Sequence, residues 1–231
     1  MKGSKFLRIL LSSSVSIVIL FASCKKEECE DNIDNNPVIE NKGTFTDNRD
    51  GKEYEWLKIG SQIWMTENLA YKVDTGGSWA YLNDENNVTV YGYLYSWQVA
   101  IVVAPDGWHL PTDNEWKILE KSLGMNDEEV NNLNWRGIDE GSKIAGNNTL
   151  WENESLTNNV NFGASQFLAL PAGGFNMENQ SFLGLGKACY FWTATDNVNN
   201  AYLRILYSSY IRINRTDFPK ARGFSIRCVK D

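Results

Sequence analysis

The sequence predicts an α+β fold in which an antiparallel sheet packs with two or three helices and carries long loops. Apolar and polar residues alternate with period two through the last third of the chain, as in antiparallel strands with one face towards solvent. Residues 112–123 instead repeat their apolar side chains at helical spacing. Between these two segments, residues 136–188 are rich in Gly, Asn and Ser, a composition typical of long connections.

The start of the chain has the pattern of an export signal and a tether. A basic start precedes an apolar run over 9–21, which is too short to cross a membrane and resembles a signal peptide. The run ends Phe21-Ala22-Ser23-Cys24, where small residues before a cysteine are typical of a bacterial lipobox with a lipidated Cys24. The alternative is an ordinary secretory signal with an incidental cysteine. We predict a signal peptide over 1–23, a flexible acidic tether over 24–43 and one globular domain over 44–231.

Net charge limits the partners of the mature chain. Removing 23 residues that carry three positive charges leaves 208 residues and changes the net charge from −7 to −10. An acidic chain is a poor candidate for nucleic acid or for attraction to anionic lipid, so the acyl chains at Cys24 would hold it to the membrane. The Cys-Lys-Lys-Glu-Glu opening of the tether is similar to signals that send lipoproteins to the cell surface, and it also fits a plain solvated linker.

The domain begins with two hairpin signals, at Asp50-Gly51 and at Gly60-Ser61, each followed by a short apolar run. Residues 47–51 also invite comparison with a calcium loop. Arg49 stands where such a loop needs an oxygen ligand, so a hairpin turn is favoured.

Residues 79–90 are predicted as a loop because Asn and Asp cluster there. Residues 95–103, with Ser96 as a possible cap, fit either a helix or a strand.

The strongest helix prediction covers residues 112–123. Thr112 and Glu115 have capping-box spacing, Gly124 is a stop signal, and 126–133 fits a short further helix. The apolar face of the central helix carries Trp116, Leu119 and Leu123.

Four runs in the last third read as strands, over 190–193, 203–205, 211–214 and 224–228. Arginines alternate with the apolar residues of these runs and are expected on a face towards solvent; a patch for an anionic ligand is the alternative. The arginines are Arg204, Arg212 and Arg227.

Five motifs follow one another along the chain: Ile59-Gly60-Ser61-Gln62-Ile63-Trp64-Met65-Thr66-Glu67-Asn68-Leu69, Trp108-His109-Leu110-Pro111-Thr112 with Glu115-Trp116, Leu170-Pro171-Ala172-Gly173-Gly174, Tyr190-Phe191-Trp192-Thr193-Ala194-Thr195 and Gly223-Phe224-Ser225-Ile226-Arg227-Cys228. In this order they resemble the Fibrobacter succinogenes major paralogous domain. More distantly, the helix entrance and the chain end are similar to the formylglycine-generating-enzyme branch of the C-type lectin-like fold. The resemblance implies a C-type lectin-like fold over about 44–231 and favours a helix at 95–103, but it brings no settled activity.

Two cysteines, Cys189 and Cys228, fall in the domain and form a candidate disulfide in an exported protein. The resemblance points instead to a cysteine just before the Pro-x-Gly-Trp turn as the usual partner of the last one. Ala104 occupies that position here. The reactive cysteine pair of the formylglycine-generating enzymes has no counterpart, so that chemistry is not carried over.

Sequence signals for catalysis are few. His109 is the single histidine, and at a helix entrance such a residue more often packs and hydrogen-bonds than catalyses. Neither Cys-x-x-Cys nor His-x-x-x-His occurs, and there is no phosphate loop or nucleophile elbow, so no metal site and no cofactor are predicted. An enzyme is therefore the less favoured reading.

Aromatic residues make up 13% of the chain, and rings in polar loops suit the faces of sugars. Trp64, Trp108, Trp116 and Trp192 are expected in the core, whereas Trp79, Trp135 and Trp151 lie in polar loops. The predicted ligand surface combines the 136–188 loops with the strand end at residues 196–197. Its residues are Asn148, Trp151, Glu152, Asn153, Asp196 and Asn197.

The sequence thus predicts a lipoprotein of the bacterial outer membrane, displayed at the cell surface, that acts as a binding or adhesion module for a glycan or protein ligand. Two alternatives remain open. One is an enzyme of unknown type that uses His109 and nearby carboxylates; the other is a structural component of the envelope without a ligand.

Overall fold

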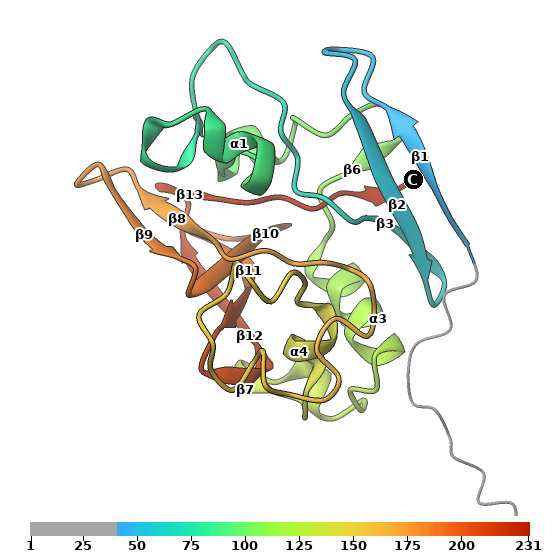
Figure 1. Ribbon diagram of the computed structural model, residues 1–231. Coiled ribbons are helices and arrows are strands. Elements are labelled where there is room, and N and C mark those ends of the chain that lie inside the picture. The colour runs from blue at the N-terminus through green and yellow to red at the C-terminus, as the bar shows by residue number, and fades with distance from the viewer. Residues whose placement is uncertain (1–40) are drawn as a thin grey trace, which may run out of the picture. The chain divides into compact units, whose positions relative to one another are not determined.

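The structure is a computed structural model that describes residues 41–231 (Figure 1). The predicted lipidation site at Cys24, the signal peptide and residues 24–40 of the tether lie outside the described residues. Every helix of residues 41–231 falls short of the length and apolar character that a membrane crossing requires.

The described chain begins with a five-stranded sheet. Its first two strands form an antiparallel hairpin, and the amide of Gly51 closes the turn by donating to the carbonyl of Asp47 over 2.8 Å. The Asp47 carboxylate also binds Arg49 within the turn, so the hairpin prediction at 47–51 is confirmed. In spatial order the strands are β1 (Lys42–Thr46), β2 (Glu53–Ile59), β3 (Gln62–Met65), β14 (Val229–Lys230) and β6 (Trp108–His109).

A second, larger sheet contains the strands predicted over 190–193, 203–205 and 211–214, which do pair in antiparallel fashion along β10, β11 and β12. The strand predicted over 224–228 is not formed: only Phe224 lies in a strand, at the end of 222–224, and residues 226–228 have no regular structure. A parallel contact between Gly173 and Cys189 makes this sheet mixed. Its spatial order is β4 (Ser78–Trp79), β5 (Leu94–Ser96), β13 (Arg222–Phe224), β8 (Ala172–Asn176), β10 (Ala188–Asn197), β11 (Asn200–Tyr207), β12 (Tyr210–Pro219) and β7 (Asn134–Arg136), with β9 (Ser181–Leu185) beside β8.

The central helix is confirmed as α3. The hydroxyl of Thr112 accepts from the amide of Glu115, while the Glu115 carboxylate accepts from the amide of Thr112, so the capping box is complete. The other helix predictions were too long: 95–103 is divided between a strand and one helical turn, and 126–133 contains only a 3₁₀ turn. The helices are α1 (Asn86–Tyr91), α2 (Trp97–Ala100), α3 (Asp113–Ser122) and α4 (Glu140–Ile144), with 3₁₀ turns η1 (Tyr81–Asn83) and η2 (Glu129–Asn131).

Two segments predicted as loops carry regular structure. β4, η1 and α1 lie wholly or partly within 79–90, and 136–188 contains α4, β8 and β9. In both segments the helices and strands are six residues or shorter. Because Asn and Gly lie at their ends, the average composition of each segment resembles that of a loop.

Both faces of the larger sheet are buried, which contradicts the prediction of one face towards solvent. Tyr190 and Trp192 belong to one apolar cluster, while their neighbours Cys189 and Phe191 belong to another. Arg204 and Arg227 are fully buried, whereas Arg212 is exposed as predicted. The four tryptophans expected in the core, Trp64, Trp108, Trp116 and Trp192, are all buried.

Candidate ligand-binding groove

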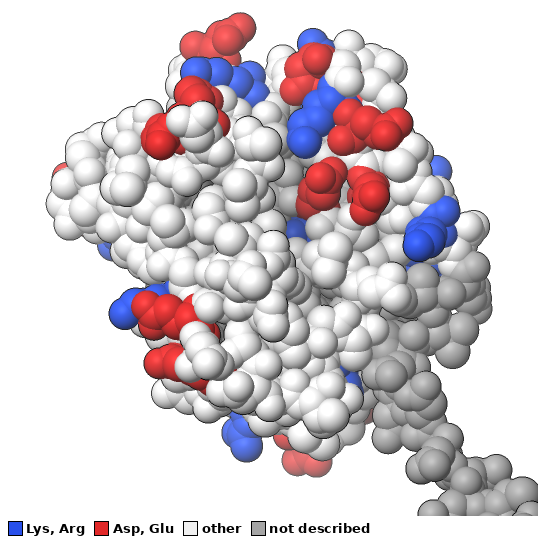
Figure 2. Space-filling view, in the orientation of Figure 1, with Lys and Arg blue, Asp and Glu red and all other residues white. Residues whose placement is uncertain are grey.

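A hollow in the described chain lies between the β1–β2 hairpin, α1 and the segment 166–170. It has two adjoining chambers of about 240 and 460 Å³. Glu55, Thr66 and Leu168 line both chambers and mark where they join. In Figure 2 the front face is hollowed beside the hairpin, with acidic side chains along that border. We call the two chambers together the hairpin groove.

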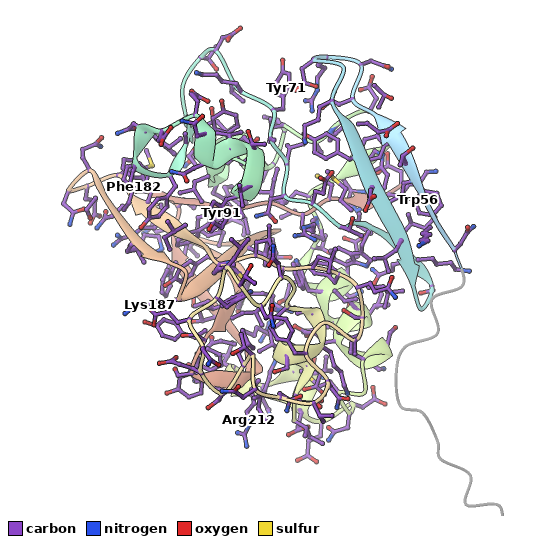
Figure 3. All side chains as sticks on the ribbon, in the orientation of Figure 1. Trp56, Tyr71, Tyr91, Phe182, Lys187 and Arg212 are labelled. Carbon is purple, nitrogen blue, oxygen red and sulfur yellow. The ribbon has the colours of Figure 1, made fainter. Side chains whose placement is uncertain are left out.

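One aromatic side chain lines the larger chamber. Trp56 of β2 stands in its wall together with its neighbours Glu55 and Leu57. The indole lies across Gly43 of β1, where a Cβ would approach a ring carbon to 2.8 Å (Figure 3). The larger chamber therefore offers one aromatic ring in an otherwise aliphatic and polar lining.

Thr66 carries an unused hydrogen-bonding group beside the groove. The residue is only 6% exposed, and its Oγ1 has no hydrogen-bond partner within the described residues. A buried hydroxyl without a partner costs about 1–3 kcal/mol relative to a satisfied one. A ligand group that bonds to this hydroxyl recovers that free energy, so the site favours a polar occupant at the junction of the chambers.

The wall opposite the hairpin is held in strained backbone conformations. Gln166 and Leu168 have φ of 56° and 59°, and Asn147 at the edge of the smaller chamber has φ of 53°. A left-handed conformation is rare for a bulky residue such as leucine and costs of the order of 1–3 kcal/mol. Strain of this kind is concentrated at binding sites in proteins, and here three such residues border one groove.

Arg227 fixes this wall from behind. Its guanidinium is fully buried and donates to the carbonyls of Phe167 and Leu168, the latter over 3.1 Å, and to Oδ1 of Asn68 over 2.8 Å. No carboxylate within the described residues lies within 4 Å of this cation, and burial lowers its pKa to about 9. The same side chain thus ties both sides of the smaller chamber, since Asn68 and Leu168 line it.

The charged residues of the groove are balanced. Lys42 and Lys52 contribute two cations, and Glu55 and Glu67 contribute two carboxylates. The remaining polar groups are hydroxyls and amides, and the apolar groups are Leu, Val and Ala side chains together with the ring of Trp56. Such a lining suits a ligand with alternating polar and apolar parts. Among residues 41–231, no three His, Cys, Asp or Glu side chains are arranged to hold a metal ion.

The predicted ligand surface on the 136–188 loops is corrected by the burial of Trp151. This ring is 4% exposed, and its Nε1 donates to the carbonyls of Gly146 and Ala169 over 3.1 and 3.3 Å. Trp151 therefore anchors its loop in the core and cannot offer a face to a ligand. Two of its exposed neighbours have local partners: Glu152 pairs with Lys187, and the side-chain Oδ1 of Asn153 accepts from the hydroxyl of Thr157. Asn148 is exposed.

Asp196 and Asn197 lie at the β10–β11 turn, where Asp196 binds Lys220 over 2.5 Å and Asn197 donates to Asp217 over 3.2 Å. Within residues 41–231, no hydrogen bond or ion pair links them to the loop around Trp151. The structure does not assemble the two groups into one site.

The candidate disulfide is also corrected. Cys189 and Cys228 are free thiols, and they are buried in different apolar clusters. Burial raises the pKa of both thiols to about 12, so neither is a thiolate near neutral pH.

His109 connects the chain end to α3 through its two ring nitrogens. Its Nε2 lies 2.8 Å from Glu115 and its Nδ1 lies 2.6 Å from Asp231 (side-chain carboxylates). Burial lowers the pKa of His109, but the bonds to the two carboxylates outweigh burial, so the pKa is raised. With both ring nitrogens bound, the imidazole holds structure together rather than offering a free base to a substrate.

Sequence reasoning missed the groove because its residues lie in segments read as a plain hairpin and a loop. One signal was available: the polar run Thr66-Glu67-Asn68 directly follows an apolar strand. The same run belongs to one of the motifs on which the family resemblance rests. A strand end with a purely structural role does not explain why these polar residues are part of that motif.

The described residues form an α+β domain with a preformed groove between two of its segments. Residues 57–230, about three quarters of the chain, match the family model described as the Fibrobacter succinogenes major domain, and the chain belongs to this family. Comparison with curated proteins and with solved structures gives no significant match.

Proposed function

We propose that this protein is a lipid-anchored binding or adhesion module of the bacterial envelope whose ligand occupies the hairpin groove. The observation that carries the proposal is the unpartnered Thr66 hydroxyl in a groove whose opposite wall is held in strained conformations. Folding a chain around such a wall is costly, and a bound ligand is the simplest compensation.

The scaffold proposed for this groove is C-type lectin-like. Support comes from two sheets with short helices, long connections, and a last strand that returns to the first sheet and pairs there between β3 and β6. Support for anchoring comes from the small-small-Cys order at residues 22–24, which is typical of a bacterial lipobox with a lipidated Cys24. The location proposed with this anchor is the outer membrane, with display at the cell surface. The ligand belongs to the glycan or protein class.

A groove-filling substitution tests the proposal. Glu55→Trp places a large side chain at the junction of the chambers from an exposed position, so it should abolish ligand capture and leave the melting temperature nearly unchanged. Glu53→Trp is the matched control, because Glu53 is exposed on the same face of β2 but lies outside both chambers. The measurement is capture on glycan and peptide arrays, with Glu53→Trp expected to behave as the parent.

A second variant isolates the hydroxyl. Thr66→Val keeps the shape and removes the group that a ligand would bond, so affinity should fall about tenfold while thermal stability is kept or improved.

Equal array signals from the parent and Glu55→Trp would show that the groove is not the ligand site.

A further inference from the structure

An exposed aromatic stack lies at the edge of the larger sheet, on β7 and β12. The rings of Trp135 and Tyr210 are parallel to within 13°, and their centroids are 4.2 Å apart. Tyr210 is 46% exposed, and neither ring belongs to one of the three apolar clusters of the described residues. Trp135 therefore supports Tyr210 from one side, and the stack leaves aromatic surface open to solvent.

Polar groups on the same strand surround this stack. Tyr210, Arg212 and Asn214 alternate along β12, so their side chains leave the same face of the strand. Asn214 is the cross-strand partner of Trp135, and its Oδ1 is buried without a hydrogen-bond partner. Arg212 is exposed at the lower edge of the view in Figure 3, and within residues 41–231 its guanidinium has no ion-pair partner.

We propose that this surface is a second binding site, for an acidic saccharide. The C–H groups on one face of a pyranose ring pack against the negative face of an aromatic ring, which Tyr210 presents. A sugar hydroxyl supplies the donor that Oδ1 of Asn214 lacks once the side chain turns towards it. The free guanidinium of Arg212 pairs with a carboxylate on the sugar, because Arg binds carboxylates with two parallel hydrogen bonds.

The chemistry of this surface differs from that of the hairpin groove. The groove is hollow, has a mixed polar and apolar lining and is balanced in charge, whereas the stack is open and its one exposed charge is positive. The two sites share no residue, so the stack proposal stands or falls independently of the proposed function.

Native gel electrophoresis through acidic and neutral polysaccharides tests the stack. The probes are polygalacturonate and galactomannan, and the sample is the full mature protein in mild detergent at physiological salt. We expect polygalacturonate to retard the parent protein and galactomannan to retard it at least fivefold less. Tyr210→Ala and Arg212→Gln should each reduce the retardation at least fivefold, while Tyr210→Phe, which keeps the ring, should retain it.

Lys230→Gln is the matched control for charge, since it removes one exposed cation from a different sheet and should migrate as the parent does. Equal melting temperatures of the variants exclude unfolding as the cause of a change. Absence of retardation, retardation that survives Tyr210→Ala, or retardation that only Glu55→Trp removes would each overturn the proposal. The last of these outcomes would assign the saccharide to the hairpin groove.

Discussion

Arg204 is the residue on which the larger sheet and α3 depend most directly. Its guanidinium donates to Glu120 over 2.6 Å and to Asp113 over 2.8 Å, and all three side chains are buried. Burial raises the pKa of Asp113, but the hydrogen bond from Arg215 and the charge of Arg204 outweigh it, so that pKa is held well below its ordinary value. The network therefore stays ionised. Removing one of its charged side chains would leave the partners of that side chain buried without a matching charge.

Arg204→Met should lower the free energy of unfolding by about 3–5 kcal/mol, because it leaves Glu120 and Asp113 buried with one cation fewer. Urea denaturation at neutral pH measures the change. Arg212→Met is the matched control on the neighbouring strand; because Arg212 is exposed, its substitution should change stability by no more than about 0.5 kcal/mol. Similar midpoints for the two variants would mean that the buried network contributes little.

His109 gives stability a defined pH window. The folded pKa of His109 is raised above its ordinary 6.5, so its contribution is complete below pH 6.5 and is lost as the pH rises through the folded value. Burial raises the pKa of Glu115, but its bonds to Thr112 and His109 outweigh burial and lower it below 4.5, so that contribution is lost only as the pH falls through the lowered value. The stabilisation that His109 and Glu115 contribute together is therefore complete between pH 4.5 and 6.5.

The stability difference between the parent and His109→Gln should accordingly be largest near pH 5.5 and smaller at pH 9. Melting temperatures across this range measure it. The side chain of His109 is 39% exposed, so solvent screens the interaction and the effect on the melting temperature should be modest. A difference that grows with rising pH would show that these carboxylates do not stabilise the protonated imidazole of His109.

At the scale of elements, the loop around Trp151 is held by one buried ring. Trp151→Ala should cost about 3–5 kcal/mol of unfolding free energy, because it opens a cavity and leaves the carbonyls of Gly146 and Ala169 without their shared donor. Asn148→Ala, on the same loop but exposed, should be nearly neutral. Should Trp151→Ala instead melt within a few degrees of the parent, the ring is not the anchor that its burial indicates.

Elements with their own local signals could be predicted from the sequence, and elements that depend on distant partners could not. The capping box at Thr112 and Glu115 fixes where α3 begins, and strand alternation located β10, β11 and β12. Alternation cannot say what covers each face, so Arg204 and Arg227 were placed in solvent although α3 and the 167–168 carbonyls bind them. The prediction that Trp151 belongs to a ligand surface was wrong for the same reason, since the polar residues beside it in the sequence are not the ones around its ring in the structure.

At the scale of the whole molecule, the last strand joins the features described above. β14 pairs with β3 and β6, Arg227 just before it supports the groove wall, and Asp231 just after it binds His109. The chain end thus connects the first sheet, the entrance of α3 and the hairpin groove. This arrangement explains why the sequence Gly223 to Asp231 could carry the family resemblance although the ligand groups lie elsewhere.

The proposed lipid anchor makes the attachment of the whole molecule depend on one atom, the sulfur of Cys24. The mature chain is expected to carry a net charge of −10, which gives it no electrostatic attraction to anionic lipid, and the helices of the described residues do not cross a membrane. Cys24→Ser should therefore leave the protein unlipidated and move it from the membrane fraction to the soluble fraction. Detergent partition and the mass of the N-terminal peptide measure the change. The variant should fold and bind its ligand as the parent does, since the groove begins at residue 42. Unchanged partition together with an unchanged peptide mass would contradict the anchor.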